Sequence, residues 1–347
     1  MDPEATKEQP MPPGPGVDIS EVGWGFARTR LLLTGLELKV FTHIANGKTR
    51  AHEVAQAAGA SNRGMRILLD GLLAVGLLTK TEGEYGLTEE AEQQLVEGAP
   101  GYREGHVEHL EHLWQGWSRL TEAVKLGHRP TDPLPEPGEA PVEEEEASWS
   151  VAESIFPVSY RGGQILADRL QIGRSLTGLN VIDVGAGTCA YSIPIAQRDA
   201  GSKVTAVDFP QVLPVAQAYT GRHRVTDQYD YLAGDIRTLD LGKDKYDLAI
   251  CANICHSEGA ANTRRLFAKL FAALARDGRI VIVDMMPNDE RTGPPYPLLF
   301  AVNMLVMTQE GDAFTLDEYA TWLQEVGFRP PTTLDNPEGS PFILAQK

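Results

Sequence analysis

Residues 181–197, VIDVGAGTCAYSIPIAQ, decide the fold class of this chain of 347 residues. The stretch begins with an apolar, β-branched run, turns at Gly185 and Gly187, and continues with helical spacing. Each glycine allows a close approach to the backbone at a place where a Cβ atom would clash. In an open parallel sheet, ligands bind at the carboxyl end of such a strand. The stretch therefore predicts a strand, a ligand-binding glycine turn and a helix.

Apolar runs alternate with helical segments throughout residues 150–347. Besides the first run, they read SKVTAVDF, YDYLAGD, YDLAICANI and GRIVIVDMM. Nearly continuous apolar runs are typical of strands that are buried on both faces, and their alternation with helices indicates βαβ units. We therefore expect an α/β, Rossmann-like domain with a parallel sheet over residues 150–347.

Residues 17–100 have a different organisation. Helical segments, one of them capped by Ser61, precede two short strand-like runs around Glu82-Gly83. The order of helix, turn, helix and two-stranded wing predicts a winged helix. The formal net charge of −17 argues against nucleic acid and anionic membranes as partners, because phosphate binding needs clustered Lys and Arg. We interpret residues 17–100 as an N-terminal winged-helix dimerisation domain that is all-helical apart from the wing.

The remaining segments are less regular. Residues 1–16 are polar and proline-rich, which predicts a flexible tail. Residues 101–149 predict a helical connector that includes an acidic, proline-rich loop at 136–146. No apolar run reaches the ~18 residues that span a bilayer, and the first residues lack the apolar core of a signal peptide. Since three cysteines also suit a reducing compartment, we expect a cytoplasmic protein.

The helical stretch 101–127 contains His106, His109 and His112, which follow one another at steps of three. Each step turns the side chain by about 60° around a helix, so the three imidazoles diverge. A metal site needs converging ligands. We predict an amphipathic helix here and no metal ion.

Carboxylates follow two further strand-like runs. Asp208 ends the second run, 21 residues after Gly187, where a carboxylate can accept both hydroxyls of a ribose. Gly234-Asp235-Ile236 ends the third run, where a second carboxylate can reach the amino group of an adenine. Because the carboxyl ends of parallel strands share one edge of a sheet, we expect these groups beside the glycine turn.

Two classes of cofactor suit this layout. A nicotinamide dinucleotide favours a third glycine at the start of the helix, where this chain has Ala190. Asp183, two residues before Gly185, gives the pattern D-x-G-x-G. An acid beside the turn repels a pyrophosphate but favours the cationic methionine end of S-adenosylmethionine. The sign of the charge therefore favours S-adenosylmethionine over NAD.

The motifs resemble those of class I S-adenosylmethionine-dependent methyltransferases, specifically the dimeric small-molecule O-methyltransferases of plants and bacteria. VIDVGAGTCAYSIPIA is similar to the first motif of that family, VTAVDFPQVLPVA to its ribose-binding segment and LAGDI to its G-D-[MI]-F segment. The resemblance extends from about residue 20 over nearly the whole chain. It implies a homodimer of secondary metabolism that methylates a small aromatic or heterocyclic acceptor, leaves S-adenosylhomocysteine and uses no metal.

The resemblance and the strand-end positions together define a set of expected cofactor-binding residues. They are Asp183, Gly185, Gly187, Asp208, Phe209, Gly234, Asp235, Ile236 and Asn253. Many members of the family have a lysine near the position of Asn253, so this residue departs from the common pattern.

Residues 252–259, ANICHSEG, resemble the strand of the family that ends in a catalytic histidine. His256 is therefore the candidate general base, because an imidazole accepts protons near neutral pH. Where the family commonly has His-Asp-Trp, this chain has His256-Ser257-Glu258. Glu258 is a candidate partner of the histidine and equally a candidate helix cap. Asp312, in the stretch TQEGDAFT, is a second candidate partner, since the orienting acid of the family usually lies in this loop.

Cys251 and Cys255 lie in the same stretch. If both belong to the strand, they face one side of the sheet about 13 Å apart. That separation is too long for a disulfide or a shared metal ion. We expect two core cysteines.

An apolar pocket is expected to bind the acceptor. Residues at positions 300, 303, 304 and 307 share one helical face, and polarizable methionines suit a planar acceptor. A place in the hydrophobic core or at a dimer contact would explain each candidate pocket residue equally well. The candidate pocket residues are Trp114, Trp117, Phe156, Tyr160, Phe300, Asn303, Met304 and Met307.

The sequence leaves three alternatives open. In the first, His256 only lines the pocket, and proximity drives transfer to a carbon, nitrogen or sulfur atom. In the second, the chain is an NAD-dependent oxidoreductase. In the third, it is a regulator that binds S-adenosylmethionine without catalysis.

Overall fold

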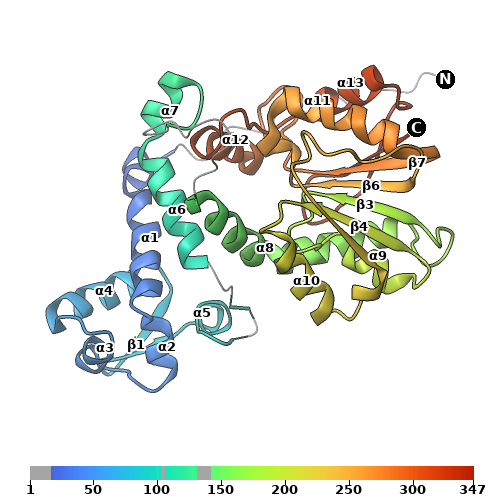
Figure 1. Cartoon of the computed structure of the whole chain (residues 1–347). Coiled ribbons are helices and arrows are strands. Elements are labelled where there is room, and N and C mark those ends of the chain that lie inside the picture. Colours follow the sequence, from blue (N-terminus) through green and yellow to red (C-terminus); the bar gives the residue numbers. More distant parts are fainter. Residues whose placement is uncertain (1–16, 100, 103–105, 131–141) are drawn as a thin grey trace, which may run out of the picture. The chain divides into compact units, whose positions relative to one another are not determined.

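The computed structural model describes residues 17–99, 101–102, 106–130 and 142–347, and the elements are shown in Figure 1. Backbone contacts divide the chain into two compact units, residues 1–103 and 104–347. The expected tail at 1–16 and most of the expected acidic loop lie outside the described residues.

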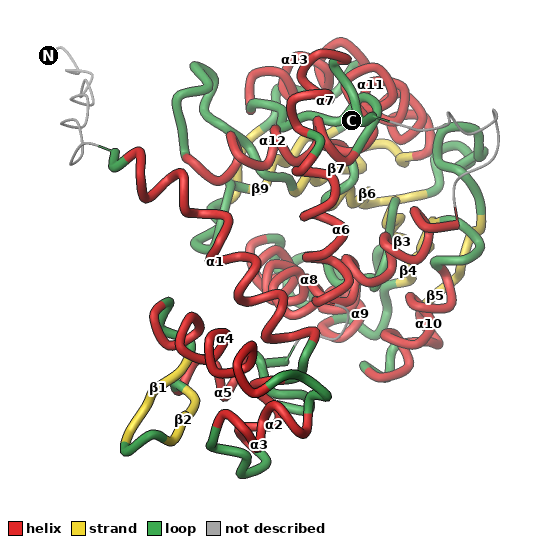
Figure 2. Tube along the Cα trace, turned by 90° about the vertical axis from the view of Figure 1, so that its left-hand side faces the viewer, coloured by secondary structure: helices red, strands yellow, loops and turns green. Residues whose placement is uncertain are grey.

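The N-terminal unit is a winged helix, as predicted. Ser61 caps the fourth helix by accepting the N–H of Gly64 at 3.1 Å. The two strands of the wing pair antiparallel (yellow in Figure 2), and Glu82 and Gly83 form their turn with positive φ angles of 53° and 84°. The elements are α1 (Ile19–Glu37), α2 (Val40–Ala45), α3 (Ala51–Ala57), α4 (Asn62–Ala74), β1 (Leu78–Thr81), β2 (Glu84–Leu87) and α5 (Glu89–Gln94).

The second unit is an α/β domain around a seven-stranded sheet in the order β5-β4-β3-β6-β7-β9-β8. The first five strands in this order are parallel, and β9 pairs antiparallel with both β7 and β8. This order confirms the Rossmann-like prediction. The strands are β3 (Asn180–Val184), β4 (Lys203–Asp208), β5 (Tyr229–Ala233), β6 (Tyr246–Ala252), β7 (Leu274–Val283), β8 (Thr332–Leu334) and β9 (Phe342–Gln346).

Helices cover both faces of this sheet, which explains the nearly continuous apolar strands. Ile182 of β3 points to the face where it packs with α11 and α13, whereas Val181 points to the opposite face, beside α8, α9 and α10. Both side chains are fully buried. The helices are α8 (Val142–Arg169), α9 (Ile193–Arg198), α10 (Leu213–Arg222), α11 (Cys255–Ala273), α12 (Pro295–Met307) and α13 (Leu316–Val326), with a 3₁₀ turn at Thr226–Gln228.

Two further helices, α6 (His106–Ser118) and α7 (Leu120–Leu126), belong to the second unit. Both pack on α12, and α6 also packs on α8, so residues 106–126 do not form a separate connector. Because α8 begins at Val142, the end of the expected acidic loop is helical instead. Among the described helices, none is long and apolar enough to cross a membrane.

Candidate functional site

The glycine turn joins β3 to α9 at the carboxyl edge of the sheet. Gly185 and Gly187 have φ angles of 64° and 50°, in the left-handed region that glycine adopts most readily. A Cβ atom on Gly185 would lie 2.9 Å from the side chain of Ile254. The missing side chain at Gly185 thus allows the turn to pack against the segment between β6 and α11.

Asp208, at the end of β4, fixes this turn. One carboxylate oxygen accepts the N–H of Gly187 at 2.8 Å, and the other accepts the N–H of Phe209 at 2.8 Å. Burial raises the pKa of Asp208 above its usual value. The side chain of Phe209 is 44% exposed, so it offers a ring surface next to the carboxylate.

Asp183 lies beneath the turn and is only 3% exposed. Its carboxylate accepts the hydroxyl of Ser192 at 2.5 Å, and Ser192 in turn accepts the hydroxyl of Tyr229 at 3.0 Å. Burial raises the pKa of Asp183 to about 7. We expected an ionised acid beside the ligand; the structure instead shows a buried acid that holds the start of α9.

The turn after β5 carries the second carboxylate of this edge. The N–H of Gly234 donates to the carbonyl of Asp208 at 2.9 Å, which joins the ends of β4 and β5. The half-buried Asp235 accepts the N–H of Arg237 at 2.8 Å on its side chain. Ile236 is 7% exposed and belongs to the hydrophobic core, so packing accounts for its side chain.

His256 is the second residue of α11 and is 8% exposed. Its Nδ1 lies 2.6 Å from Asp284, and its backbone N–H donates to the same carboxylate at 3.2 Å. The hydroxyl of Tyr319 donates to Asp284 at 2.7 Å. Burial alone would raise the pKa of Asp284, but the imidazole and these hydrogen bonds hold it below its usual value. With Nδ1–H donated to Asp284, Nε2 is the nitrogen that can accept a proton.

The two acids that we expected beside His256 have other partners. Glu258 forms an ion pair with Arg237. The carboxylate of Asp312 accepts the N–H of Ala313 at 2.7 Å, although the backbone N–H of Asp312 does donate to the carbonyl of His256 at 2.9 Å. Sequence reasoning missed Asp284, which directly follows β7 and its apolar run GRIVIV.

Both Cys251 and Cys255 lie in the hydrophobic core, as expected, but the assumption that they share a strand is wrong. Cys251 lies in β6, but the strand ends at Ala252, and Cys255 begins α11. The chain turns at Asn253, which has a φ angle of 56°. The side chains of Cys255 and Cys251 lie near each other, and both are buried and free. Within the described part of the chain, no group of three His, Cys, Asp or Glu residues could hold a metal ion.

Asn253 has a partner that sequence reasoning did not find. Its side chain lies near that of Tyr191, and burial raises the pKa of this tyrosine to about 12. Asn253 and Tyr191 therefore connect the end of β6 to the glycine turn, and both lie at the expected cofactor edge of the sheet.

The expected pocket residues fall into two groups. On α12, Phe300 meets the ring of His256 edge-on at 4.8 Å between centroids, and Asn303 accepts the indole N–H of Trp117 at 2.9 Å. A Cβ atom on Gly116 of α6 would lie 2.5 Å from the sulfur of Met307. Trp114 is half-buried on α6, and Met304 is 6% exposed in the packing of α12. These contacts place α6 and α12 together beside His256.

Phe156 and Tyr160 belong to a different region. Phe156 packs against Tyr160 at 5.4 Å and against Tyr219 at 4.3 Å between ring centroids. Tyr160 also donates a hydrogen bond to Gln197 at 2.7 Å. Both therefore lie on the face covered by α8, α9 and α10, whereas His256 lies on α11. Their expected place in the acceptor pocket is not supported.

Four features together are typical of a Rossmann-like methyltransferase. They are the order of the strands, the glycine turn, the acids at the ends of β4 and β5, and the His256–Asp284 pair. Residues 163–329 match the family model of an O-methyltransferase domain, and residues 21–97 match an O-methyltransferase dimerisation domain. The chain belongs to the S-adenosylmethionine-dependent O-methyltransferases.

Similar proteins include two enzymes of Streptomyces species. The chain is 31% identical to 3-hydroxy-5-methyl-1-naphthoate 3-O-methyltransferase of Streptomyces sahachiroi, over 89% of this chain and 88% of the relative. It is 29% identical to the tetracenomycin polyketide synthesis 8-O-methyl transferase TcmO of Streptomyces glaucescens, over 91% of both chains. A crystal structure of a putative O-methyltransferase from Nostoc punctiforme has a TM-score of 0.84 and 28% identity, with 94% of this chain and 98% of that chain covered.

Proposed function

We propose that this chain transfers the methyl group of S-adenosylmethionine to a hydroxyl of a small aromatic acceptor, and that Nε2 of His256 takes the hydroxyl proton. The observation that carries this proposal is the 2.6 Å contact between Nδ1 of His256 and the buried Asp284. It leaves one defined nitrogen as a proton acceptor at the edge of the sheet where ligands bind.

The residues at this edge suit S-adenosylmethionine. We assign the glycine turn to the methionine part, Asp208 to the ribose, and Asp235 with the exposed ring of Phe209 to the adenine. The support is that Asp208 is already oriented by two backbone N–H groups while its remaining lone pairs can accept ribose hydroxyls. Membership of the methyltransferase family decides against NAD, which the sequence left open.

The bound cofactor supplies a methyl group on a sulfonium, whose leaving sulfur needs no proton. The protein therefore has to align the acceptor and remove its proton. Asp284 holds the imidazole in the required tautomer and stabilises the imidazolium that forms. Asp284 suits this role because its pKa is held low, so it remains ionised near neutral pH.

The acceptor class follows from the residues around His256. Phe300 and Met307 offer apolar and polarizable surface, and Trp117 with Asn303 adds a polar contact. Two relatives carry names that specify a hydroxynaphthoate and a tetracenomycin intermediate as the molecules that they methylate. We therefore infer a planar phenol of two or more fused rings as the acceptor.

Methyl transfer tests this proposal directly. The purified protein is incubated with S-adenosylmethionine and a hydroxynaphthoate, and S-adenosylhomocysteine and the methylated product are measured. We expect a methyl ether, and a rate at least ~100-fold lower for His256→Gln. Transfer only to carbon, nitrogen or sulfur acceptors would contradict O-methylation, and an unchanged rate in the variant would remove His256 from proton transfer.

We also infer that the chain is a homodimer and acts in the cytoplasm. The dimerisation domain match and the exposed apolar side chains of α1 support the dimer. Three free, buried thiols are compatible with a reducing compartment.

A further inference from the structure

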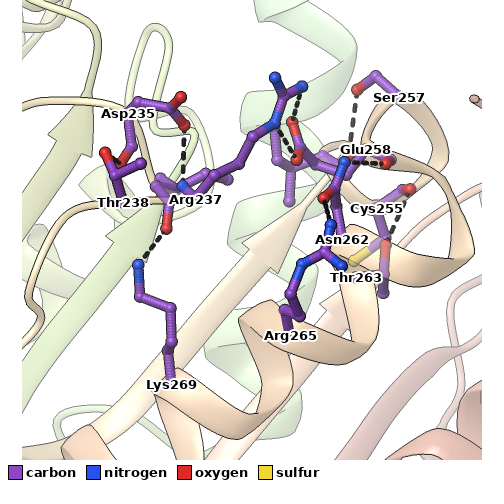
Figure 3. A network of polar contacts seen from close by, with 12 residues as sticks. Asp235, Arg237, Thr238, Cys255, Ser257, Glu258, Asn262, Thr263, Arg265 and Lys269 are labelled. Atoms are coloured by element: carbon purple, nitrogen blue, oxygen red, sulfur yellow. Dashed lines mark hydrogen bonds and ion pairs between the residues drawn. The ribbon is translucent and has the colours of Figure 1, made fainter. Parts of the chain in front are cut away.

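Arg237 and Glu258 form an ion pair next to the proposed cofactor site (Figure 3). Nε and Nη2 of Arg237 donate to the two carboxylate oxygens of Glu258 at 2.9 and 3.1 Å. Glu258 is 9% exposed, whereas about half of the arginine side chain is exposed. A bidentate ion pair with a buried carboxylate fixes the relative positions of the two side chains more closely than a surface ion pair does.

The pair connects two functional segments. Arg237 follows Asp235 by two residues, and its backbone N–H donates to the side chain of Asp235 at 2.8 Å. Glu258 follows His256 by two residues in the first turn of α11. One ion pair therefore joins the turn that carries the adenine-binding candidate to the helical turn that carries the proposed base.

Further hydrogen bonds hold the turn after β5. The carbonyl of Asp235 accepts the N–H groups of Thr238 and Leu239 at 3.0 and 2.8 Å. A second contact to α11 comes from Lys269, which donates to the carbonyl of Ile236 (Figure 3). Lys269 lies about four helical turns beyond the start of α11, so Arg237 is the contact that reaches the turn of His256.

His256 itself does not depend on this pair. Asp284 binds both its ring and its backbone N–H, and the loop after α12 binds its carbonyl. Loss of the Arg237–Glu258 pair should therefore loosen the Asp235 turn more than the imidazole.

We propose that the Arg237–Glu258 ion pair is a positioning element that holds the Asp235 turn in the conformation that binds the adenosine part of the cofactor. This inference rests on the proposed function. It predicts that the pair sets the affinity for the cofactor, while the turnover rate with saturating cofactor depends on His256 and Asp284.

The test compares Arg237→Met with Arg237→Lys and with the control Arg265→Met. Arg265 lines the same small surface hollow as Arg237, but it bonds to Asn262 on its own helix, so its loss removes an equal charge without separating the two segments. Calorimetry measures the Kd of S-adenosylhomocysteine, and kinetics measure KM and kcat.

For Arg237→Met we expect a Kd at least tenfold higher and a kcat within about threefold of the wild type at saturating cofactor. Arg237→Lys should recover part of the affinity, and Arg265→Met should remain within about twofold. Should Arg237→Met fail to fold, Glu258→Gln is measured by the same criteria.

Two results would overturn the inference. One is an unchanged Kd in a folded Arg237→Met protein, and the other is an equal loss in Arg265→Met, which would indicate a general effect of charge. Failure of the proposed function looks different, because the wild type itself would then bind no S-adenosylhomocysteine.

Discussion

Four donors surround the carboxylate of Asp284: the imidazole Nδ1–H and backbone N–H of His256, the hydroxyl of Tyr319 and the N–H of Met285. A carboxylate can accept from all of them, but an amide has an NH₂ group that would face another donor. The surroundings of Asp284 therefore require a group that only accepts hydrogen bonds, and this requirement fixes the tautomer of His256.

Asp284→Asn should consequently lower kcat by about 10²–10⁴-fold. The NH₂ group of the asparagine would donate to Nδ1, so the imidazole proton would move to Nε2, and Nε2 could no longer accept the proton of the acceptor. The Kd of S-adenosylhomocysteine should change little, since Asp284 lies outside the proposed cofactor contacts. Asp312→Asn is the matched control, because its carboxylate bonds to Ala313 and not to the imidazole. Single-turnover rates for both variants provide the measurement; equal rates in Asp284→Asn and wild type would contradict the proposed tautomer.

Asp183 should make the stability of the fold depend on pH. Its pKa in the folded chain is raised to about 7 by burial, so the folded state holds a proton that the unfolded state releases near pH ~4. The stability from this proton is complete below the unfolded pKa and is lost as pH rises through about 7.

We therefore expect Asp183→Asn, which stays neutral and still accepts the hydroxyl of Ser192, to lose less stability than the wild type between about pH 5 and pH 8. Urea unfolding at several pH values measures the difference. If the free energies of unfolding of the two proteins ran parallel with pH, the buried acid would not titrate as we describe.

Some site residues followed from the sequence, and others did not. Gly185, Gly187, Asp208 and Asp235 could be predicted from local chain order, because each lies at or within three residues of the end of a strand whose apolar run is visible. Asp284 also follows such a run, but it is 28 residues from His256. The pairing of β6 with β7 brings Asp284 close to His256, and the local spacing of residues in the sequence does not predict that pairing.

At the scale of elements, the periodicity of the sequence identified which residues share a face of a helix, but not which element that face packs against. The spacing in α12 grouped four residues on one face. Phe300, Asn303 and Met307 contact His256 or α6, whereas the fourth, Met304, is buried. Phe156 and Tyr160 are aromatic residues of α8 and were assigned to the same pocket, yet they pack beside α10. The position of α8 on the opposite face of the sheet decides this, and the sequence pattern alone did not show it.

Two helix contacts depend on glycine and should respond differently to alanine. A Cβ atom on Gly163 of α8 would lie 2.5 Å from the carbonyl oxygen of Ala190, a backbone atom next to the glycine turn. At Gly116 of α6 the close atom is the sulfur of Met307, on a flexible side chain. Backbone cannot give way, whereas a methionine side chain can rotate.

Gly163→Ala should therefore cost about 1–3 kcal/mol of stability and weaken cofactor binding, because α8 is pushed off the glycine turn. Gly116→Ala should leave stability within about 1 kcal/mol and change mainly the KM of the acceptor. Thermal unfolding and steady-state kinetics measure both. A larger loss of stability in Gly116→Ala than in Gly163→Ala would show that we have assigned the rigid and the adaptable contact the wrong way round.

At the scale of the whole molecule, α1 exposes a run of large apolar side chains. Val22, Trp24 and Phe26 are 59–71% exposed in the single chain. Burial of one such side chain contributes about 1.5–3 kcal/mol relative to full exposure, before the costs of association are subtracted. A second copy is the proposed partner, since these residues lie within the dimerisation domain match.

The triple variant Val22→Ser, Trp24→Ser, Phe26→Ser should be a monomer at concentrations where the wild type is a dimer. Val124→Ser serves as the control, because Val124 is a comparably exposed residue of α7, outside the dimerisation domain match. Sedimentation velocity distinguishes the two states. A triple variant that remains dimeric would place the interface elsewhere.

The division of the molecule was only partly predictable. The change from helical spacing to alternating strands marked two folds, and both are present. The sequence also suggested a separate connector, but α6 packs on α8 and α12 because its apolar side chains need partners that its own segment cannot supply.

The central claim is that the carboxyl edge of the sheet binds S-adenosylmethionine through the glycine turn and Asp208. Titration of S-adenosylhomocysteine into the wild type and Asp208→Ala, followed by calorimetry, tests this most directly. We predict a measurable Kd for the wild type and one at least tenfold higher for the variant, a loss of about 1.4 kcal/mol. Equal affinities, or no binding by the wild type, would contradict the account.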